Sequence, residues 1–410
     1  MKTYIILFGI TGDLSRRMLL PSLESLLSSE LISNIFLYGV SRRDLKKEDI
    51  FSQDSLLSEN FKSIKLDENI QDYKNLLNSI ELENNDQILI YLSVPPTSAL
   101  SYVKKLGEAG FNKKNIKLLL EKPFGINYSS AKNFLCEINQ YFSEEQVYKV
   151  DHYMAKKNSQ FIIPFKIANQ SFFEEFFNNK FVEKIEVLGL EQIDIQGRSI
   201  FYEQTGALRD FIQGHLMQLL ILTLCDAKDK DINHILQQRS ECVNELSLLN
   251  DDSCTNAQYE GYKEEVNNEK SNVETYAKVV LNSSNPKWLN VPLILITGKA
   301  LDKKESSIII SFKNKTVSKL KITPYTPFPQ NVKFNGVELK NIENNFLDGY
   351  KGVLYNAIFG KKDVFTSNVE ILKSWQIFDS LLEKWNKSEK IQIYKKGSSF
   401  EQIEEEKTTN

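Results

Sequence analysis

Two short segments hold most of the side chains that could carry out acid–base chemistry. In the first, Asp151, His152, Tyr153 and Lys156 follow the apolar residues 147–150. Together they offer a carboxylate, two hydrogen-bond donors and a cation. This set suits the binding of a phosphorylated sugar, or a carboxylate that orients a catalytic histidine. A surface turn rarely needs such a mixture.

The second segment, GALRDFIQGHL, contains Asp210 and His215 and opens a helix predicted from Gly206 to about Leu224. His215 lies at the edge of the apolar stripe of that helix, where an isolated histidine is more often a hydrogen-bonded core residue than a catalytic one. Asp210 and His215 are five residues apart, which is about 140° around an α-helix. At that angle they cannot pair directly, but they could flank one pocket.

A turn with two glycines, Gly9-Ile10-Thr11-Gly12-Asp13, follows the apolar residues 4–8. Glycines let the backbone approach a pyrophosphate, and the N-terminus of a following helix favours negative charge. By itself the G-x-x-G spacing also fits a simple turn between a strand and a helix. Its place after the first strand favours a dinucleotide loop.

Basic residues follow two further apolar strands. Arg42 belongs to Ser41-Arg42-Arg43, which comes directly after residues 35–40, where a dinucleotide fold meets the adenosine ribose. An arginine there accommodates the 2′-phosphate of NADP, whereas an acidic residue favours NAD, and the nearby Asp44 leaves NAD possible. Lys122 follows residues 117–121, at a strand end where it could meet either cofactor or substrate.

These residues need a scaffold, and the apolar pattern predicts two domains. Residues 1–157 alternate continuous apolar strands with helices, which predicts a Rossmann domain with a doubly wound parallel sheet. Residues 158–410 predict an α+β domain with a large, mostly antiparallel sheet. Its expected strands are 184–192, 276–282, 292–297 and 306–312, with a late helix near 367–385. The polar residues 250–273 and 401–410 predict exposed loops.

Composition narrows the class of protein. The chain has 410 residues with a net charge of −3, so the basic field that nucleic acid would need is missing. No apolar run is long enough to span a bilayer, and the N-terminus leads straight into a strand without a signal peptide. Four scattered cysteines predict neither a disulfide framework nor a metal site. We therefore expect a cytoplasmic protein with no nucleic-acid or membrane partner.

Taken in order, the motifs resemble those of the glucose-6-phosphate dehydrogenase family. The resemblance runs nearly end to end, and the DHY motif and the RD-x-x-Q-x-H helix are highly specific together. The matching segments are FGITGDLSRRMLLPSL, YLSVPPT, LLLEKPFG, YKVDHYMAKK, GALRDFIQGHLMQLL, QYEGYKEE, VPLILITGKAL and DGYKGVLYNAI.

The resemblance implies a reaction and a role for each matching residue. The C1 hydroxyl of glucose 6-phosphate would be oxidised to 6-phosphogluconolactone, with hydride transfer to NADP, as the first step of the oxidative pentose phosphate pathway. His215 would be the catalytic base, oriented by Asp151. The substrate would meet Lys122, His152, Tyr153, Lys156, Glu191, Asp210, Lys299 and Lys304. The cofactor would meet Gly9, Ile10, Thr11, Gly12, Asp13, Leu14, Arg42, Pro95 and Lys122. The resemblance also implies a homodimer or homotetramer.

Some positions depart from the family pattern. Met18 stands where the family has a lysine that helps to position the substrate, and Ala155 replaces a glycine of the DHY motif. Residues 312–348 are compressed, which predicts fewer strands in the second sheet.

Two alternatives stay open. One is another sugar oxidoreductase, of the glucose–fructose oxidoreductase type, although a neutral sugar does not need the cation of residues 152–156. The other is a weakly active regulatory homologue, which Met18 favours and the joint presence of Asp151, His152, Asp210 and His215 disfavours.

Overall fold

The chain folds into two compact units. The computed structural model describes residues 1–66, 69–226, 228–313, 319–322, 333–334, 337–340, 342–343, 345–388 and 390–409. The first unit contains Met1–Gly125, Ser129–Lys157 and Phe346–Asn368, and the second contains Ile126–Tyr128, Asn158–Asn345 and Val369–Asn410. The pattern predicts one boundary after residue 157, whereas Phe346–Asn368 also belongs to the first unit. The chain returns to the first unit with this segment, because its helix α11 (Gly349–Ile358) adds Val353 and Leu354 to the core of that unit.

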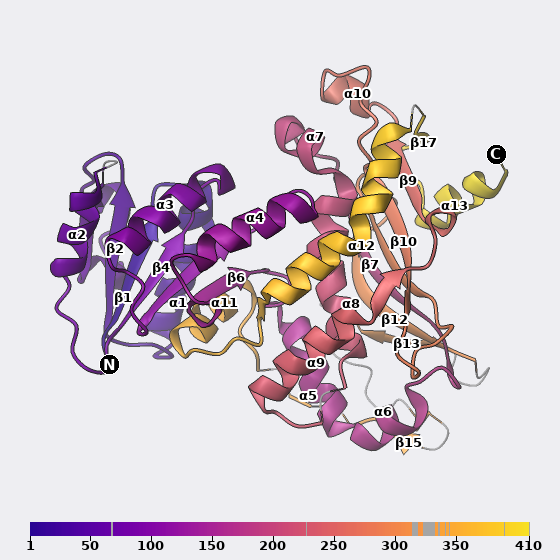
Figure 1. Cartoon of the computed structure of the whole chain (residues 1–410), viewed down its shortest axis with the longest axis horizontal. Helices are drawn as coiled ribbons and strands as arrows, with labels where there is room; N and C mark the ends of the chain where they lie inside the picture. Colours follow the sequence, from indigo (N-terminus) through magenta and orange to yellow (C-terminus); the bar gives the residue numbers. More distant parts are fainter. Residues whose placement is uncertain are drawn as a thin grey trace. The chain divides into compact units, whose positions relative to one another are not determined.

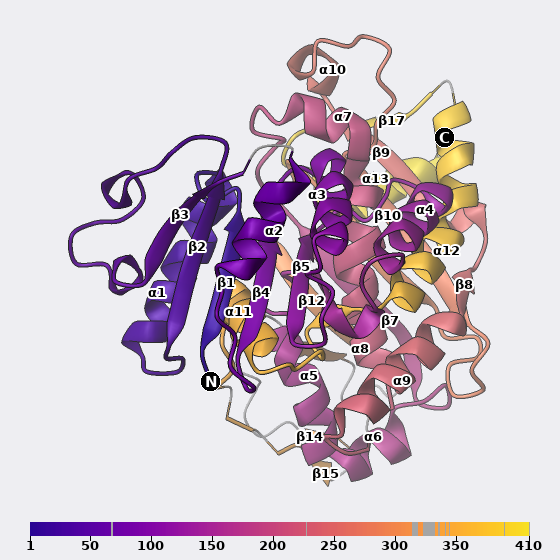
Figure 2. The same ribbon diagram turned by 60° about the vertical axis from the view of Figure 1, so that its left-hand side comes forward.

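The first unit is built on a sheet in the order β3-β2-β1-β4-β5-β6-β16, which confirms the predicted doubly wound fold (Figure 2). All neighbouring strands in this sheet are parallel except the short β16, which pairs antiparallel with β6. The strands are β1 Thr3–Phe8, β2 Ile35–Ser41, β3 Phe61–Lys65, β4 Gln87–Leu92, β5 Ile116–Glu121, β6 Val147–Val150 and β16 Phe365–Thr366. The half-polar β3 escapes the sequence pattern because it lies at the sheet edge.

Helices cover both faces of this sheet. Helices α1 and α11 pack their leucines and valines on one face, while Tyr73 of α2 and Tyr102 of α3 pack against Phe8 on the other. The helices are the π-helix η1 Ser15–Leu19, α1 Leu20–Ser28, α2 Ile70–Asn78, α3 Pro96–Glu108 and α4 Tyr128–Asn139, with short η2 Lys47–Asp49, η3 Leu56–Ser58 and η4 Glu144–Gln146. Pro21 lies where the π-helix η1 passes directly into α1, so its missing N–H falls at the junction of the two helices.

The second unit contains a mostly antiparallel sheet, as predicted, in the order β13-β12-β7-β11-β10-β9-β17, with β8 paired to β10. Among its described pairs, β7 with β11 and β9 with β17 are parallel. The strands are β7 Val182–Leu190, β8 Leu246–Leu248, β9 Thr255–Tyr259, β10 Tyr276–Ser283, β11 Leu293–Gly298, β12 Glu305–Phe312, β13 Lys319–Ile322 and β17 Gln392–Tyr394. A separate pair joins β14 Lys333–Phe334 to β15 Val337–Glu338. The compression predicted within 312–348 falls largely outside the described residues.

The helices of the second unit are α5 Lys157–Ala168, α6 Gln170–Phe176, α7 Ser199–Ala207, the π-helix η5 Leu208–Leu216, α8 Met217–Leu224, α9 Ile232–Asn244, the short η6 Asp251–Ser253, α10 Tyr262–Glu265, α12 Asn368–Lys387 and α13 Phe400–Thr409. In the described part of the chain, no helix has the length and apolarity to cross a membrane. Figure 1 labels the α-helices among these elements.

The prediction of an exposed loop over 250–273 is wrong. This stretch contains strand β9 and helix α10, and its tyrosines Tyr259 and Tyr262 are fully buried. Their hydroxyls donate hydrogen bonds to Glu265 and Glu203 at 2.6 and 2.8 Å. Glu265, one of the polar residues that made this stretch resemble a loop, is thus the partner of a buried tyrosine.

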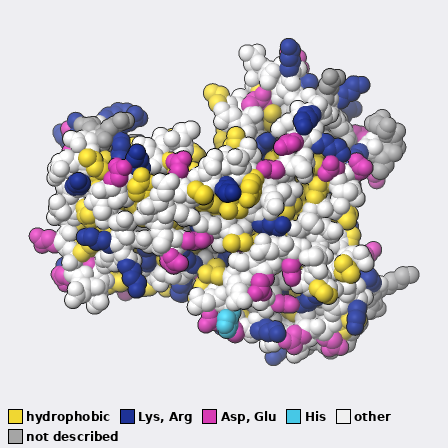
Figure 3. Space-filling model, in the orientation of Figure 1, with side chains coloured by type: hydrophobic (Ala, Val, Ile, Leu, Met, Phe, Trp, Pro, Cys, Tyr) yellow, Lys and Arg dark blue, Asp and Glu magenta, His cyan; other side chains and the backbone are white. Residues whose placement is uncertain are grey.

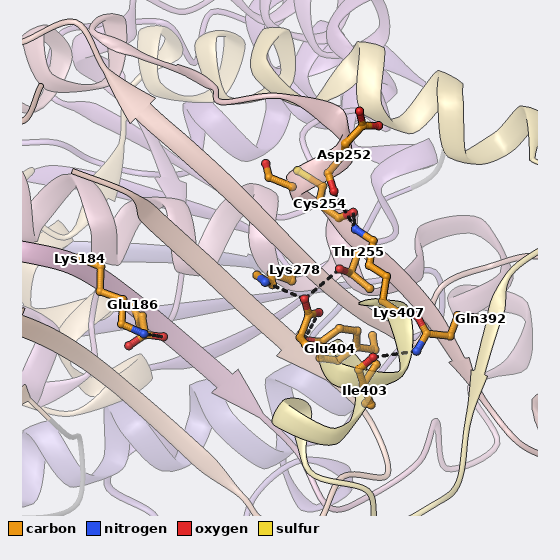
Figure 4. A network of polar contacts seen from close by, with 12 residues as sticks. Lys184, Glu186, Asp252, Cys254, Thr255, Lys278, Gln392, Ile403, Glu404 and Lys407 are labelled. Atoms are coloured by element: carbon orange, nitrogen blue, oxygen red, sulfur yellow. Dashed lines mark hydrogen bonds and ion pairs between the residues drawn. The ribbon is translucent and has the colours of Figure 1, made fainter. Parts of the chain in front are cut away.

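The prediction of a loop at the C-terminal tail is also wrong, because α13 packs beside β9 and β10 (Figure 4). Glu404 accepts hydrogen bonds from Thr255 Oγ1, Tyr276 OH and Lys278 Nζ at 3.1, 2.8 and 2.6 Å. Lys407 donates to the carbonyl oxygen of Cys254 at 2.7 Å. Charged residues of the tail therefore anchor it to the sheet.

A fully buried ion pair ties three helices of the second unit together. Arg239 of α9 donates through Nε and Nη2 to Glu370 of α12 at 2.9 and 3.0 Å. Its Nη2 also reaches Gln218 of α8 at 3.4 Å. Removing one partner of such a pair typically costs about 3–5 kcal/mol, because the other charge stays buried. The pair therefore fixes α8, the continuation of the helix that carries His215.

A carboxyl in the first unit lies between two tyrosines. Glu121, at the end of β5, accepts hydrogen bonds from the hydroxyls of Tyr91 on β4 and Tyr350 on α11. Burial of the carboxyl raises the pKa of Glu121 to about 7 from the ordinary 4.5, and the Asp151 charge adds to this. The tyrosine hydrogen bonds and the Lys122 charge oppose the rise.

We expect Glu121→Gln to flatten the pH dependence of stability. Because the folded pKa of Glu121 lies above the unfolded value, its contribution is present below pH 4.5 and is lost as the pH rises to about 7. At full effect this loss is about 3 kcal/mol. Glutamine is neutral at every pH, so the variant should gain thermal stability over wild type at pH 8 but little at pH 5, as followed by circular dichroism. Glu24→Gln, in the same unit, is the control, and an equal shift of the midpoint at both pH values would contradict the prediction.

Candidate functional site

The predicted site residues of the first unit lie along one edge of its sheet. Parallel strands bring their carboxyl ends to the same edge, where doubly wound folds bind their ligands. The residues that follow β1, β2, β4, β5 and β6 are Gly9, Arg42, Pro95, Lys122 and Asp151. The register places Phe8 beside both Val40 and Leu92, so these strand ends are level.

Gly9 makes a turn that a side chain would block. Its φ is 73°, and a Cβ atom there would lie 2.2 Å from the carbonyl oxygen of Ser93. The Gly12 N–H and the Ser15 hydroxyl both donate to the carbonyl oxygen of Gly9, at 2.9 and 2.8 Å. This tight turn leads straight into helix η1, so the loop fits an anionic pyrophosphate held close to the backbone.

The other residues of the loop differ in exposure. Ile10 is fully buried in the core, so only its backbone can meet a cofactor. Thr11 and Asp13 are exposed, and Leu14 packs against the core. Asp13 pairs with Arg17 across one helical turn at 3.5 Å. The loop therefore offers backbone groups and the Thr11 hydroxyl to a ligand.

Two further cofactor residues predicted from the sequence are exposed at this edge. Arg42 follows β2 directly, and Pro95 precedes the first residue of helix α3. The position of Arg42 is the one that meets the adenosine ribose in doubly wound folds. Its guanidinium suits a 2′-phosphate, because it can donate two parallel hydrogen bonds to phosphate oxygens.

Asp151 organises the turn that carries the predicted phosphate ligands. The carboxylate of this buried residue accepts the Tyr153 N–H at 2.9 Å, and its carbonyl accepts the Met154 N–H at 3.0 Å. The Lys156 Nζ lies 3.2 Å from the centroid of the Tyr153 ring, and the His152 ring meets that of Tyr153 edge-on at 5.2 Å. We call His152, Tyr153 and Lys156 the phosphate cluster.

The sequence did not indicate Tyr350 as a neighbour of this cluster. Its ring stacks on His152 with centroids 6.2 Å apart and 13° between the planes. Tyr350 belongs to the DGYKG segment, whose match to the family carried no role. Burial lowers the pKa of His152, the Asp151 charge raises it, and the charges of Lys156 and Lys122 lower it further. His152 is therefore held mainly neutral near pH 7.

The departures from the family pattern have simple structural settings. Met18 is 44% exposed on helix η1, so it fills no core position. Ala155 is fully buried, and its carbonyl oxygen accepts the Gly349 N–H at 3.0 Å. The Lys122–Pro123 peptide bond is cis.

Glu191 and Lys299 form an ion pair in the second unit. They follow β7 and β11, which are parallel neighbours, with Leu190 opposite Gly298. Glu191 N–H donates to the Gly298 carbonyl at 2.9 Å, and Lys299 is 4% exposed. The sequence named both residues only through the family resemblance. A prediction that β7 and β11 pair in parallel would also have predicted the contact between Glu191 and Lys299.

Asp210 and His215 lie on η5, which is a π-helix and not the α-helix that the 140° estimate assumes. In a π-helix each N–H bonds to the carbonyl five residues earlier, so residues five apart lie closer around the axis than in an α-helix. The expected separation of about 140° therefore does not apply to Asp210 and His215. His215 is buried and meets the Phe211 ring edge-on at 5.3 Å.

Lys304 stands apart from these groups. It is exposed on the segment between β11 and β12, five residues after Lys299. Its predicted contact with substrate stays a prediction.

Each unit thus carries half of a chemical set. The first unit offers a glycine turn for an anion, an exposed guanidinium and the phosphate cluster. The second unit offers a histidine that can accept a proton, two carboxylates and a lysine. A proton acceptor, cations and neutral donors are what oxidation of a phosphorylated sugar requires.

Comparisons with known proteins agree with this set. The family described as glucose-6-phosphate dehydrogenase, NAD binding domain, matches residues 6–160, and its C-terminal domain family matches residues 163–332 and 319–408. A glucose-6-phosphate 1-dehydrogenase of Borreliella burgdorferi is 29% identical over 440 aligned positions, covering 93% of this chain and 91% of that protein.

A second relative, from Arabidopsis thaliana, is named glucose-6-phosphate 1-dehydrogenase 6, cytoplasmic. It is 27% identical, covering 96% of this chain and 88% of its own. A solved glucose-6-phosphate dehydrogenase in complex with its substrate glucose 6-phosphate shares the fold, with a TM-score of 0.85, 21% identity and coverage of 97% and 95% of the two chains. Because the two domain families together span most of its length, the chain belongs to the glucose-6-phosphate dehydrogenase family.

Proposed function

We propose that this chain is an active glucose-6-phosphate dehydrogenase that prefers NADP. The phosphate cluster is the observation that carries the proposal, because a neutral sugar does not need it. It lies at the same sheet edge as the Gly9 turn, in one compact unit. The net charge of −3 and the mixed positive and negative side chains on the face in Figure 3 support a small-molecule substrate over nucleic acid. A cytoplasmic homodimer or homotetramer completes the proposal.

The roles follow from the chemistry of the side chains. His215 takes the proton of the C1 hydroxyl, and Asp151 supplies the carboxylate that stabilises the resulting imidazolium. Lys156 meets the phosphate as a cation, while His152 and Tyr153 meet it as donors. The Gly9 turn would hold the pyrophosphate of NADP and Arg42 its 2′-phosphate, and the bound nicotinamide would supply the acceptor for the C1 hydride.

The substrate side extends into the second unit. Asp210, Glu191 and Lys299 bind the sugar or its phosphate side, and Lys122 meets both substrate and cofactor. The ion pair with Glu191 keeps the buried Lys299 in one orientation, since a buried ammonium needs its partner. This preorganisation lets the site bind the sugar without first ordering these side chains.

Kinetics of the wild-type chain tests the function. NADPH formation, followed by absorbance, should proceed with glucose 6-phosphate and NADP and be much slower with glucose. Turnover with glucose alone would favour a sugar oxidoreductase of another type. Turnover with neither sugar, at high substrate and with either cofactor, would favour a regulatory homologue, for which the exposed Met18 is the supporting observation.

Arg42→Ala should weaken the preference for NADP. The loss of a guanidinium that meets the 2′-phosphate should lower kcat/KM for NADP roughly 10-fold or more and leave kcat/KM for NAD within about 3-fold. Steady-state kinetics with both cofactors measures this. Arg43→Ala is the matched control, because it removes an adjacent exposed arginine. If kcat/KM falls equally for both cofactors, the assignment of Arg42 to the 2′-phosphate is wrong.

His215→Asn should lower kcat without weakening substrate binding. A positioned general base contributes roughly 10²- to 10⁴-fold to turnover, and asparagine cannot take the proton. KM for glucose 6-phosphate should stay within about 3-fold of wild type. His234→Asn is the control, since His234 is exposed on α9 and pairs with Asp229. Near-normal turnover of His215→Asn would refute its role as base.

His152→Asn should weaken the binding of glucose 6-phosphate. A lost hydrogen bond to a charged phosphate should raise KM for glucose 6-phosphate roughly 10- to 100-fold, with a smaller effect on kcat. The KM for NADP should change little. An unchanged KM for glucose 6-phosphate would show that the phosphate lies elsewhere.

A further inference from the structure

We infer that Glu274 is a positioning residue for the proposed reaction: its buried side chain fixes the start of the helix that carries Asp210 and His215. This inference rests on the proposed function, and it adds a residue to which the sequence motifs gave no role. Glu274 precedes strand β10, far along the chain from η5. Its link to the site is therefore visible only in the fold.

Two hydrogen bonds from the start of η5 end on this one residue. The Leu208 N–H donates to Glu274 Oε1 at 3.0 Å, and the Ala207 N–H donates to the Glu274 carbonyl oxygen at 2.9 Å. The first N–H groups of a helix have no partner within the helix. A carboxylate at that end also meets the positive end of the helix dipole. Glu274 therefore sets where η5 begins.

The chain makes room for this carboxyl with a glycine. Gly206 separates α7 from η5 with φ 65° and ψ 177°, a conformation that other residues rarely adopt. A Cβ atom on Gly206 would lie 2.5 Å from Glu274 Oε1 and 2.7 Å from its Cδ. The backbone of the helix start and the carboxyl are thus packed as one unit. Neither can shift without the other.

Stability alone does not explain a carboxyl at this place. Glu274 is 5% exposed, and burial raises its pKa, although the Leu208 N–H and the Arg209 charge oppose the rise. Burying such a group is costly, and an apolar side chain of similar size is often as stable or more so. Directed hydrogen bonds are what an apolar side chain would lack. The burial therefore points to a role in orientation.

The next residue connects the same segment to Lys299. The Lys299 N–H donates to the Thr275 carbonyl oxygen at 2.9 Å. The Tyr394 hydroxyl bridges Thr275 Oγ1 and the Lys299 carbonyl oxygen at 2.9 and 2.7 Å. Glu274 therefore holds the start of η5, and Thr275 holds Lys299, the lysine that pairs with Glu191. They fix the spacing between the base and the sugar-binding ion pair.

The test compares Glu274→Ala with Glu274→Gln in the full chain. A misplacement of about 1 Å can cost roughly 100-fold in rate, so we expect Glu274→Ala to lower kcat roughly 10- to 100-fold. KM for NADP should stay within about 3-fold. Glutamine keeps an oxygen that can accept the Leu208 N–H, so Glu274→Gln should return kcat to within about 5-fold of wild type. A merely destabilising change would not give this split.

Glu404→Ala is the matched control (Figure 4). Glu404 is a partly buried carboxylate on α13, and it accepts hydrogen bonds from Tyr276 and Lys278 of β10, on the sheet and not on η5. Its loss should lower thermal stability and leave kcat unchanged. Equal loss of kcat in the Glu404 and Glu274 variants would overturn the inference. So would normal kcat in Glu274→Ala, or a Glu274→Gln variant as slow as Glu274→Ala.

Hydrogen exchange tests the inference without an activity assay. Amides of residues 208–216 should exchange faster in Glu274→Ala than in wild type, and near the wild-type rate in Glu274→Gln. An unchanged rate in Glu274→Ala would overturn the inference. If the wild-type chain proves inactive, the proposed function fails, whereas faster exchange would still support the placement of η5 by Glu274.

Gly206→Ala supplies a second route if Glu274→Ala folds poorly. The new Cβ atom would push on the carboxyl, so we expect a loss of kcat similar to that of Glu274→Ala. In the double variant the clash with the carboxyl is gone and only the strain of the positive φ remains, so the combined loss should be smaller than the product of the two single losses. A full product would mean that the two positions act independently, which would overturn the inference.

Discussion

Parallel pairing brings the carboxyl ends of neighbouring strands to one edge, and the predicted site residues follow such ends in both units. In the first unit this holds from β1 to β6. In the second unit most strands are antiparallel, yet the pair that carries Glu191 and Lys299, β7 and β11, is parallel. Antiparallel pairing over six residues would place these residues at opposite edges, about 20 Å apart. The ion pair therefore depends on strand direction.

Gly9, after a strand end, and Gly206, before a helix start, allow close contacts that a side chain would block. At Gly9 the neighbour that excludes a side chain is the carbonyl of Ser93, and at Gly206 it is the carboxyl of Glu274. In both places a helix with π hydrogen bonding follows, η1 in the first unit and η5 in the second. Such helices are rare, and they are frequent at functional sites. The well-packed cores beneath these glycine turns and π-helices offset their energetic cost.

Much of the scaffold was predictable because its strands are continuous apolar runs. Elements such as β9 and α13 escaped prediction because they are polar in composition. The Gln258 amide of β9 donates to the Val273 carbonyl oxygen, and Glu404 of α13 accepts a hydrogen bond from the buried Tyr276. The motif residues could be named from the sequence, but their contacts could not. Tyr350 reaches His152, and Glu274 reaches Leu208, across long stretches of chain. No local period encodes such pairs, because tertiary packing alone creates them.

The charge at the phosphate cluster is set by its own neighbours. Lys156 lies against the Tyr153 ring, whereas burial lowers the pKa of His152, so that residue contributes a donor and little charge near pH 7. A phosphate dianion beside His152 would favour the imidazolium, because an opposite charge stabilises the charged form. Binding of phosphate and binding of a proton are then linked through His152.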